Sequence, residues 1–401
     1  MSRSESSTEL MLLESDVENS SSSKIISGLH KFFIERIIWA HLFIIAISKL
    51  HNPLRAIKAI LNLEKIRRAY MGDHKLIRLV KVDQKYSWHP NIPSWPSNAF
   101  NLFHENEINR INTFRIIQGE LNLLILSITK KCPLKCEHCF EWDIMHKPET
   151  LSLEDLKEII RRYQEQGLAT LELSGGEPLS RFNDLIELVQ FASISSEVWV
   201  LTSGFGLTLK KAYSLKNIGL TGITISLDHF DEAMHNSFRG HGKSFSWVIK
   251  AVENAIKVGL TTCLSICATK RFVTRNNLMK YAELAKNLGV CYVQILEPKA
   301  TGNYANKDVL LSNEQISEIT DFHYMMNSEK KFREYPLVVY HGYHQRRMGC
   351  LGGGNRYLYI DSNGDIHPCP FCHSPMGNAL SGPNGIDMKL STCNSFEFSE
   401  S

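Results

Sequence analysis

The chain of 401 residues lacks an apolar run long enough to cross a bilayer. The mainly apolar stretch 37–47 is eleven residues long, whereas a spanning helix needs about 20. Charge of one sign is not in excess either, because 45 Lys and Arg against 42 Asp and Glu leave a net charge of +3. This balance says little about nucleic acid, and no nucleic-acid partner is expected. The first 23 residues, rich in serine and acidic groups, contain no basic segment followed by an apolar one. We therefore expect a disordered tail and no cleavable signal peptide.

Cysteine, by contrast, is plentiful, and three of the ten cysteines stand in one short segment. Cys132, Cys136 and Cys139 have the spacing CxxxCxxC. Thiolates are the ligands that iron–sulfur clusters select, and the common closed sites use four of them. A set of three would leave one iron with an exchangeable position. A zinc site completed by a distant ligand, or a chance cluster of cysteines, stays open as the alternative.

The context of this loop resembles the cluster loop of radical S-adenosylmethionine (SAM) enzymes, because a strand-like run over residues 121–128 precedes it and Phe140 follows it. The resemblance implies a [4Fe–4S] cluster whose open iron binds SAM. It also implies that the reduced cluster cleaves SAM to a 5′-deoxyadenosyl radical, which abstracts hydrogen from a substrate. A reductant such as flavodoxin or ferredoxin is then a partner. Contacts with the adenine are assigned to Phe140 and to His138, which stands where many relatives have tyrosine.

A second segment, Gly175-Gly176-Glu177-Pro178, follows the strand-like run 171–174 and resembles the motif of that family that contacts the amino group of SAM. Glycine lets a backbone approach a ligand closely, and a carboxylate suits an ammonium group. We therefore predict that Gly175, Gly176 and Glu177 bind the cofactor. The simpler interpretation is a turn at the end of a strand.

Polar residues end the next two strand-like runs, which is where barrel folds place their sites. Thr202 and Ser203 resemble the end of the third strand of the family, with Ser203 in place of asparagine, and Ser226 and Asp228 resemble the end of the fourth. The resemblance implies that these side chains face the remainder of SAM. Arg239 lies in a segment that often follows the fourth strand and is assigned to the cofactor or the substrate, with a solvated loop arginine as the alternative.

Between residue 121 and about residue 302, a short apolar run followed by an amphipathic segment repeats six times. This alternation predicts parallel strands with right-handed crossovers, and the resemblance implies the same architecture. We predict an α/β fold: a partial (β/α)6 TIM-type barrel with a helical amino-terminal extension and a small carboxyl-terminal cysteine-rich α+β cluster domain. The predicted divisions are 1–23 for the tail, 24–116 for the extension, 117–305 for the radical SAM core and 306–401 for the cluster domain.

A second set of cysteines follows the predicted barrel and comprises Cys350, Cys369, Cys372 and Cys393. Residues 361–364, Asp-Ser-Asn-Gly, favour a tight turn between two strands because Asn-Gly accepts positive φ. The arrangement resembles the opening of a SPASM auxiliary-cluster domain, whose second cysteine run is missing here. It implies one auxiliary [4Fe–4S] cluster, and a closed zinc site with the same four ligands stays open.

The other three cysteines, Cys263, Cys267 and Cys291, lie in apolar runs and are predicted to be small buried core residues. Cysteines that bind metal must be reduced, and seven of the ten are assigned to metal. We therefore expect a cytoplasmic protein.

The segment from residue 24 to about residue 116 is basic and partly apolar, with no clear pattern of three strands or of a helix-turn-helix. Residues 49–81 hold nine Lys or Arg against two acids, Glu64 and Asp73. A basic amphipathic helix over residues 54–66, beside the apolar stretch 37–47, predicts an in-plane anchor at the inner membrane surface. A helical hairpin that packs on the barrel with a solvated basic side is the alternative.

These patterns together predict a radical SAM enzyme whose substrate is a small molecule, a lipid or a peptide. We favour a membrane-associated or small hydrophobic substrate. The alternatives are an enzyme that modifies peptides and a non-catalytic scaffold that carries an iron–sulfur cluster or zinc. A scaffold needs neither an open iron nor a ligand for an ammonium group, which argues against it.

Overall fold

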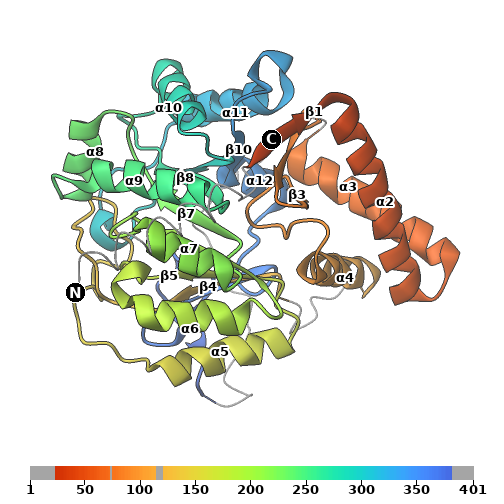
Figure 1. Cartoon of the computed structure of the whole chain (residues 1–401), viewed down its shortest axis with the longest axis horizontal. Helices are drawn as coiled ribbons and strands as arrows, with labels where there is room; N and C mark the ends of the chain where they lie inside the picture. The colour runs from red at the N-terminus through yellow and green to blue at the C-terminus, as the bar shows by residue number, and fades with distance from the viewer. Residues whose placement is uncertain (1–22, 73–74, 114–120, 382–401) are drawn as a thin grey trace, which may run out of the picture.

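The computed structural model describes residues 23–72, 75–113 and 121–381. Within these residues a central sheet of ten strands carries the core helices, and an amino-terminal unit of helices and three strands packs beside it (Figure 1). Except for its last residue, the tail predicted over residues 1–23 lies outside the described residues.

Six parallel strands form the centre of the sheet, as the sequence predicts. They are β4 (Leu123–Ser127), β5 (Thr170–Ser174), β6 (Glu197–Thr202), β7 (Gly222–Ser226), β8 (Thr261–Cys267) and β9 (Tyr292–Leu296). Two further parallel strands extend the sheet: β10 (Leu337–Tyr340) pairs with β9, and β11 (Tyr357–Ile360) pairs with β4. The predicted α/β class with a largely parallel sheet is confirmed, with two parallel strands more than the sequence indicated.

Helices connect the parallel strands and cover the outer face of the sheet (Figure 1). They are α5 (Leu153–Glu165), α6 (Phe182–Ala192), α7 (Leu209–Asn217), α8 (Glu232–Arg239), α9 (Ser244–Lys257), α10 (Arg275–Asn287) and α11 (Asn313–Ser328), with short 3-10 turns η2 (Gly302–Tyr304) and η3 (Lys330–Phe332). Helix α12 (His341–Met348) follows β10 and packs instead between β9 and α3 of the amino-terminal unit. In α5, Ser152 and Asp155 form a capping box at the start. Leu156, Ile159 and Tyr163 then recur at helical spacing and are buried in the main core.

The predicted hairpin turn at residues 361–364 is present. β12 (Asp365–His367) runs antiparallel to β11, and β13 (Gly377–Asn378) runs antiparallel to β12. Gly364 has a φ of 85°, and Asp361 Oδ1 accepts hydrogen bonds from the N–H groups of Asn363 and Asp365. These strands continue the central sheet and form no sheet of their own.

The amino-terminal unit contains a helical hairpin, the alternative interpretation of this segment, and also three strands that the sequence analysis did not find. In chain order its elements are β1 (Lys24–Ser27), α2 (Gly28–Leu50), α3 (Pro53–Met71), β2 (Arg78–Val82), β3 (Lys85–Ser87) and α4 (Asn98–Thr113). β2 pairs antiparallel with both β1 and β3. The strands are short and the hairpin separates β1 from β2, so neither alternation nor spacing reveals the sheet. Among the described helices, none is long and apolar enough to cross a membrane.

The three-stranded sheet closes the amino-terminal end of the barrel interior. Val80 and Val82 of β2 share one apolar cluster with Trp199, Tyr292 and other residues near the starts of the barrel strands. Arg78 is fully buried beside them and donates hydrogen bonds to two backbone carbonyls of the α11–β10 region, each at 2.7 Å. Cys263, Cys267 and Cys291 are buried, as predicted.

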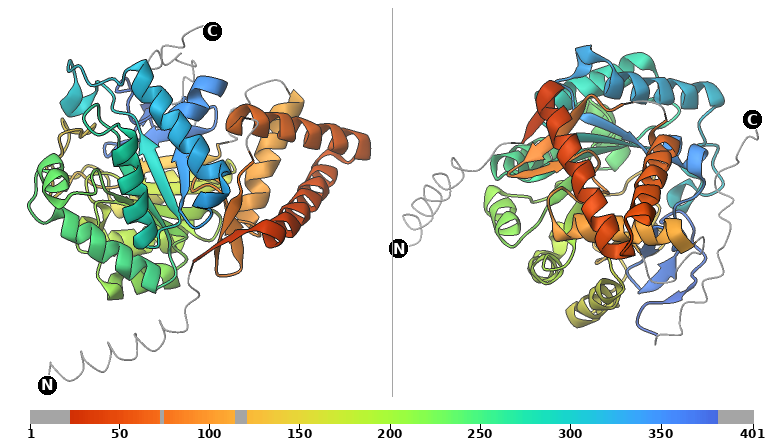
Figure 2. Two further views of the ribbon diagram at one scale, coloured as in Figure 1. Left: turned by 90° about the horizontal axis from the view of Figure 1, so that it is seen from above. Right: turned by 90° about the vertical axis from the view of Figure 1, so that its right-hand side faces the viewer.

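The helices of this unit connect the two edges of the parallel strands (Figure 2). On one side, His344 of α12 stacks on Tyr70 of α3 and shares a 2.8 Å hydrogen bond with its backbone carbonyl. On the other side, Glu107 of α4 accepts two hydrogen bonds from Arg356, which directly precedes β11. Helices α2, α3 and α4 are therefore a lateral cover of the barrel.

Candidate functional site

The three cysteines of the CxxxCxxC segment lie in the loop after β4, at the carboxyl end of the sheet. Two backbone hydrogen bonds tie this loop to the end of α8. Cys136 is buried, whereas Cys132 and Cys139 are partly exposed, and all three line one cavity. The loop thus presents three sulfur ligands to a single enclosed space.

The protonation of these thiols depends on what they bind. Burial and the proximity of Cys136 raise the pKa of Cys132 and of Cys139 to about 12, so the free side chains are neutral thiols at pH 7. A cluster takes thiolates, and the charge of its irons offsets the cost of burying them. No three His, Cys, Asp or Glu side chains in the described parts of the chain are placed to share one metal ion. In an iron–sulfur cluster each thiolate binds a different iron, so the three sulfurs need not converge on one ion. Cys132, Cys136 and Cys139 therefore fit such a cluster.

Gly175 and Gly176 follow β5 and bring backbone to the cavity wall. Gly175 has a φ of 123°. A side-chain carbon at Gly176 would lie 2.4 Å from the carbonyl oxygen of Lys131 in the cluster loop. Only glycine fits between this turn and that loop. Cofactor contact by this pair stays a prediction.

Glu177 lies behind the same turn, fully buried, just before η1 (Pro178–Arg181). Its Oε1 accepts hydrogen bonds from Leu179 N–H at 3.1 Å and from Thr202 Oγ1 at 2.6 Å. Its Oε2 accepts from Ser203 N–H at 2.8 Å and from the Ser203 hydroxyl. The carboxylate therefore holds the ends of β5 and β6 together. Thr202 and Ser203 line the cavity, whereas Glu177 does not, and its contact with an ammonium group stays a prediction.

Asp228 and Arg239 form a buried ion pair next to the cluster loop. Asp228 also accepts a hydrogen bond from the N–H of Cys267, and Arg239 Nη1 lies 3.6 Å from the Sγ of Cys136. Burial favours the neutral form of Asp228, but the Arg239 guanidinium keeps the pKa of this carboxyl below its ordinary value. Arg239 is only 8% exposed, so the solvated-arginine alternative is wrong. Both residues line the cavity together with Ser226.

His138 and Phe140 lie on the same loop and face the cavity. The His138 ring stacks on Phe238 with a centroid distance of 4.8 Å, and burial lowers its pKa to about 4, so the ring is neutral. Phe140 makes edge contacts with Tyr359 and Phe371. Both rings assigned to adenine thus line the cavity, and their contact with adenine stays a prediction.

The cavity has a volume of about 1370 Å³ and extends far beyond the cofactor motifs. It continues through the barrel interior along Glu172, Thr224, Ser265 and Gln294, and it reaches the amino-terminal helices. At that end it is lined mainly by apolar side chains of α2 and α3, among them Phe32, Ile38, Trp39, Leu42, Ile60, Leu61 and Leu63. The cofactor site and the helical extension therefore share one space.

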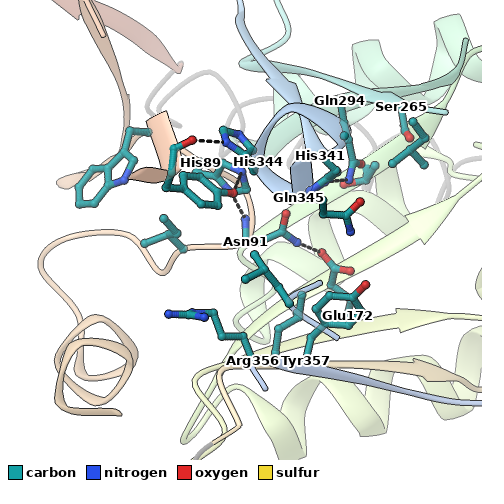
Figure 3. A pocket seen from close by; sticks show the side chains of 18 of the residues that line it. His89, Asn91, Glu172, Ser265, Gln294, His341, His344, Gln345, Arg356 and Tyr357 are labelled. Atoms are coloured by element: carbon teal, nitrogen blue, oxygen red, sulfur yellow. Dashed lines mark hydrogen bonds between the residues drawn. The ribbon is translucent and has the colours of Figure 1, made fainter. Parts of the chain in front are cut away.

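Sequence reasoning missed the polar part of this cavity wall. Figure 3 shows two pairs of polar side chains on this wall: Asn91 of the loop after β3 with Glu172 of β5, and Gln294 of β9 with His341 of α12. Asn91 Nδ2 donates to Glu172 Oε1 at 2.6 Å, and Gln294 Nε2 lies 2.6 Å from His341 Nε2. The one available signal was Glu172, a charged residue between two leucines of a buried parallel strand. The other three carry no sequence pattern.

Part of the second set of cysteines faces the same cavity as the cluster loop. Cys350 and Cys369 line the same cavity, and the N–H of Cys372 donates to the carbonyl of Cys369. Cys393 lies outside the described residues. His367 hydrogen-bonds the carbonyl of Cys372 at 3.0 Å. The auxiliary cluster, and the zinc site as its alternative, stay predictions.

Residues 126–285 match the Radical SAM superfamily. Among curated proteins, the chain is 26% identical over 272 residues to PqqA peptide cyclase of Streptomyces rochei, covering 65% of this chain and 73% of that protein. It is also 26% identical over 286 residues to AdoMet-dependent heme synthase of Methanosarcina barkeri, covering 65% and 80%. The superfamily uses a [4Fe–4S] cluster and SAM, the cofactors that the cysteine loop predicts.

Two solved structures have a similar fold. Streptococcus suis SuiB bound to precursor peptide SuiA gives a TM-score of 0.55 at 16% identity, covering 83% of this chain and 77% of that one. The structure of anSMEcpe with bound AdoMet and Cp18Cys peptide gives a TM-score of 0.50 at 20% identity, covering 65% and 78%. These similarities confirm the fold predicted for the core.

Proposed function

We propose that this chain, which carries a radical SAM domain over residues 126–285, is an enzyme that abstracts hydrogen from an amphipathic substrate held inside its barrel. The cluster and SAM, when bound, would supply a 5′-deoxyadenosyl radical. Cys132, Cys136 and Cys139 would hold the cluster, and Gly175 and Gly176 would admit SAM beside it. The observation that carries the proposal is that the cysteine loop and the glycine turn open onto one cavity. Formation of 5′-deoxyadenosine by the reconstituted chain is the test.

The substrate class follows from the far end of that cavity. Mainly apolar side chains of α2 and α3 line it there, together with the paired charges of Lys31 with Glu35 and of Arg67 with Glu64, whereas polar side chains line the barrel interior. The barrel is packed shut at the amino-terminal ends of its strands by the cluster around Val80 and Trp199. A long apolar group would therefore lie between α2 and α3, with its polar end among the barrel strands. A membrane-associated or other hydrophobic molecule has this shape.

The outer surface of the α2–α3 hairpin supports delivery from a membrane. Of the thirteen large apolar side chains exposed in the described residues, eight lie on this hairpin: Leu29, Phe32, Phe33, Ile37, Ile44, Leu54, Ile57 and Leu61. Phe32 and Leu61 also line the cavity, so the exposed surface meets the cavity at its mouth. Arg36, Arg55, Lys58 and Lys65 are exposed on the same helices. Apolar stripes with basic neighbours suit an anionic bilayer surface.

Vesicle flotation tests this part of the proposal. The full chain is expected to float with vesicles that contain phosphatidylglycerol. A Leu54→Glu/Ile57→Glu variant is expected to lose roughly ten-fold or more of the bound fraction, because it removes apolar contact and adds two charges that anionic lipid repels. Both positions are exposed and neither lines the cavity, so the fold and the cofactor site stay intact.

Ile194→Glu is the matched control, since Ile194 is 81% exposed but lies outside the hairpin. This variant is expected to float as the wild type does. Recovery of the wild type in the soluble fraction with anionic vesicles would remove the membrane part of the proposal and leave the radical chemistry standing.

A peptide substrate is the second candidate. β1 is an edge strand of the three-stranded sheet, and among the described strands only β2 pairs with it, so its outer edge is open to an added strand. PqqA peptide cyclase and the peptide-bound structures of SuiB and anSMEcpe support this candidate by their names. Under it, a short peptide encoded beside the gene would change in mass when incubated with the reconstituted chain, SAM and dithionite, and flotation would fail.

A further inference from the structure

We infer that Glu172 and Asn91 bind the polar head of the substrate, and that this head is a hydrogen-bond donor, an amine or a hydroxyl group. The inference rests on the proposed function, because it specifies one end of the amphipathic molecule proposed above. It concerns the polar wall drawn in Figure 3, which none of the cofactor motifs includes.

Glu172 is a buried carboxylate without a cation. It lies in the middle of β5, is 6% exposed and faces the barrel interior. None of the ion pairs among the described residues includes it, and its one hydrogen bond there is the 2.6 Å contact that Oε1 accepts from Asn91. Burial raises its pKa to about 7, against the lowering effect of Asn91. A buried carboxylate with an open oxygen is costly unless a donor or a cation satisfies it.

Asn91 supplies a second open acceptor. Because its Nδ2 donates to Glu172, the amide is oriented with Oδ1 away from that carboxylate, and Oδ1 is buried with no hydrogen-bond partner in the described residues. Buried amide oxygens in folded proteins are nearly always paired. Two adjacent acceptors that lack donors select a ligand group that donates hydrogen bonds, and they repel an anion.

The surrounding side chains do not satisfy these acceptors. Burial lowers the pKa of His341 to about 4, so this ring carries no charge at neutral pH. Burial also lowers the pKa of His89 well below its ordinary value, and its Nδ1 accepts a hydrogen bond from the N–H of Asn91. Arg356, which lies near this wall in Figure 3, donates instead to Glu107 through two nitrogens. None of these three side chains donates to Glu172, so a donor that would stabilise its ionised form has to come from a ligand.

The position of Glu172 also fits a substrate that reacts close to its head. Glu172 and Ser174 point to the same face of β5, and Ser174 and Gly175 line the cavity next to the cluster loop. Two residues of a strand span roughly 7 Å. If the head group of the substrate binds Glu172, the substrate carbons next to that head would lie close to the glycine turn. The rest of the apolar chain would extend toward α2 and α3.

Binding of three single-chain probes tests the inference: dodecylamine and dodecanoate, each below its micelle concentration, and dodecanol below its solubility limit, titrated into the full-length reconstituted chain by calorimetry. The wild type is expected to bind dodecylamine roughly ten-fold or more tightly than dodecanoate, with dodecanol between them. Glu172→Gln is isosteric and should remove this preference. Asn91→Ala should weaken binding of the amine and of the alcohol. Loss of the preference in Glu172→Gln, a change inside the barrel, would distinguish this site from an effect of surface charge.

Glu197→Gln is the matched control. Glu197 is a buried carboxylate on the adjacent strand, but it receives hydrogen bonds from Ser94 and does not line the cavity. This variant should keep the preference for the amine. Equal or tighter binding of dodecanoate, an unchanged preference in Glu172→Gln, or no binding of any probe would overturn the inference. Formation of 5′-deoxyadenosine by the same preparation reports the radical chemistry separately, so the two failures are distinguishable.

Discussion

A Cys132→Ala variant, reconstituted anaerobically with iron and sulfide, is expected to form no 5′-deoxyadenosine above background from SAM and dithionite, whereas the wild type forms it. The substitution removes one of the three thiolates in the loop after β4. A [4Fe–4S] cluster with two remaining ligands from this loop is not held in place. The product is measured by chromatography and mass spectrometry, and iron content is measured on the same sample.

Cys263→Ala is the control for the loss of a cysteine as such. Cys263 is fully buried in the apolar floor of the barrel with Val80 and Trp199, and it does not line the cavity. This variant should keep its iron and its product. A Cys132→Ala protein with full cluster absorption and full activity would contradict the assignment. A wild type with the expected iron and no product would favour the scaffold interpretation, or an enzyme that needs its substrate before SAM is cleaved.

Replacement of Arg239 by methionine is expected to lower the free energy of unfolding by about 3–5 kcal/mol, because it leaves the Asp228 carboxylate buried without its cation. The double variant Asp228→Asn/Arg239→Met should recover part of this loss, since it buries no uncompensated charge. Urea denaturation under reducing conditions measures both. Arg239 Nη1 also contacts the Sγ of Cys136, so the single variant should hold its cluster less tightly.

Lys250→Met provides the comparison for a lost surface ion pair. Lys250 and Glu253 pair at 3.3 Å with both side chains largely exposed, and such pairs contribute about 0–1 kcal/mol. If Arg239→Met is no more destabilising than Lys250→Met, the buried pair does not stabilise the site as argued here.

The parts of the site that sequence reasoning found are those whose residues lie together in the chain. Cys132, Cys136 and Cys139 occupy one loop, and Gly175 and Gly176 occupy one turn, so spacing alone identifies them. The burial of Arg239 could not be predicted in the same way, because its partner Asp228 lies eleven positions away and the thiol it contacts lies on another element. The three-stranded sheet of the amino-terminal unit was missed because β1 and β2 are separated by two helices.

The sequence by itself determined the alternating strands and helices of the core, the cluster loop, the glycine turn and the helical hairpin, because each depends on neighbouring residues and on the periodicity of burial. Only the tertiary structure decided that the exposed hairpin and the cluster loop share one cavity, and that Asn91 and Glu172 meet inside it. The hydrogen bond between Asn91 and Glu172 joins residues that are 81 positions apart. Their chemistry depends on burial and on the absence of a nearby cation among the described residues, and both are properties of the packed chain rather than of any segment in it.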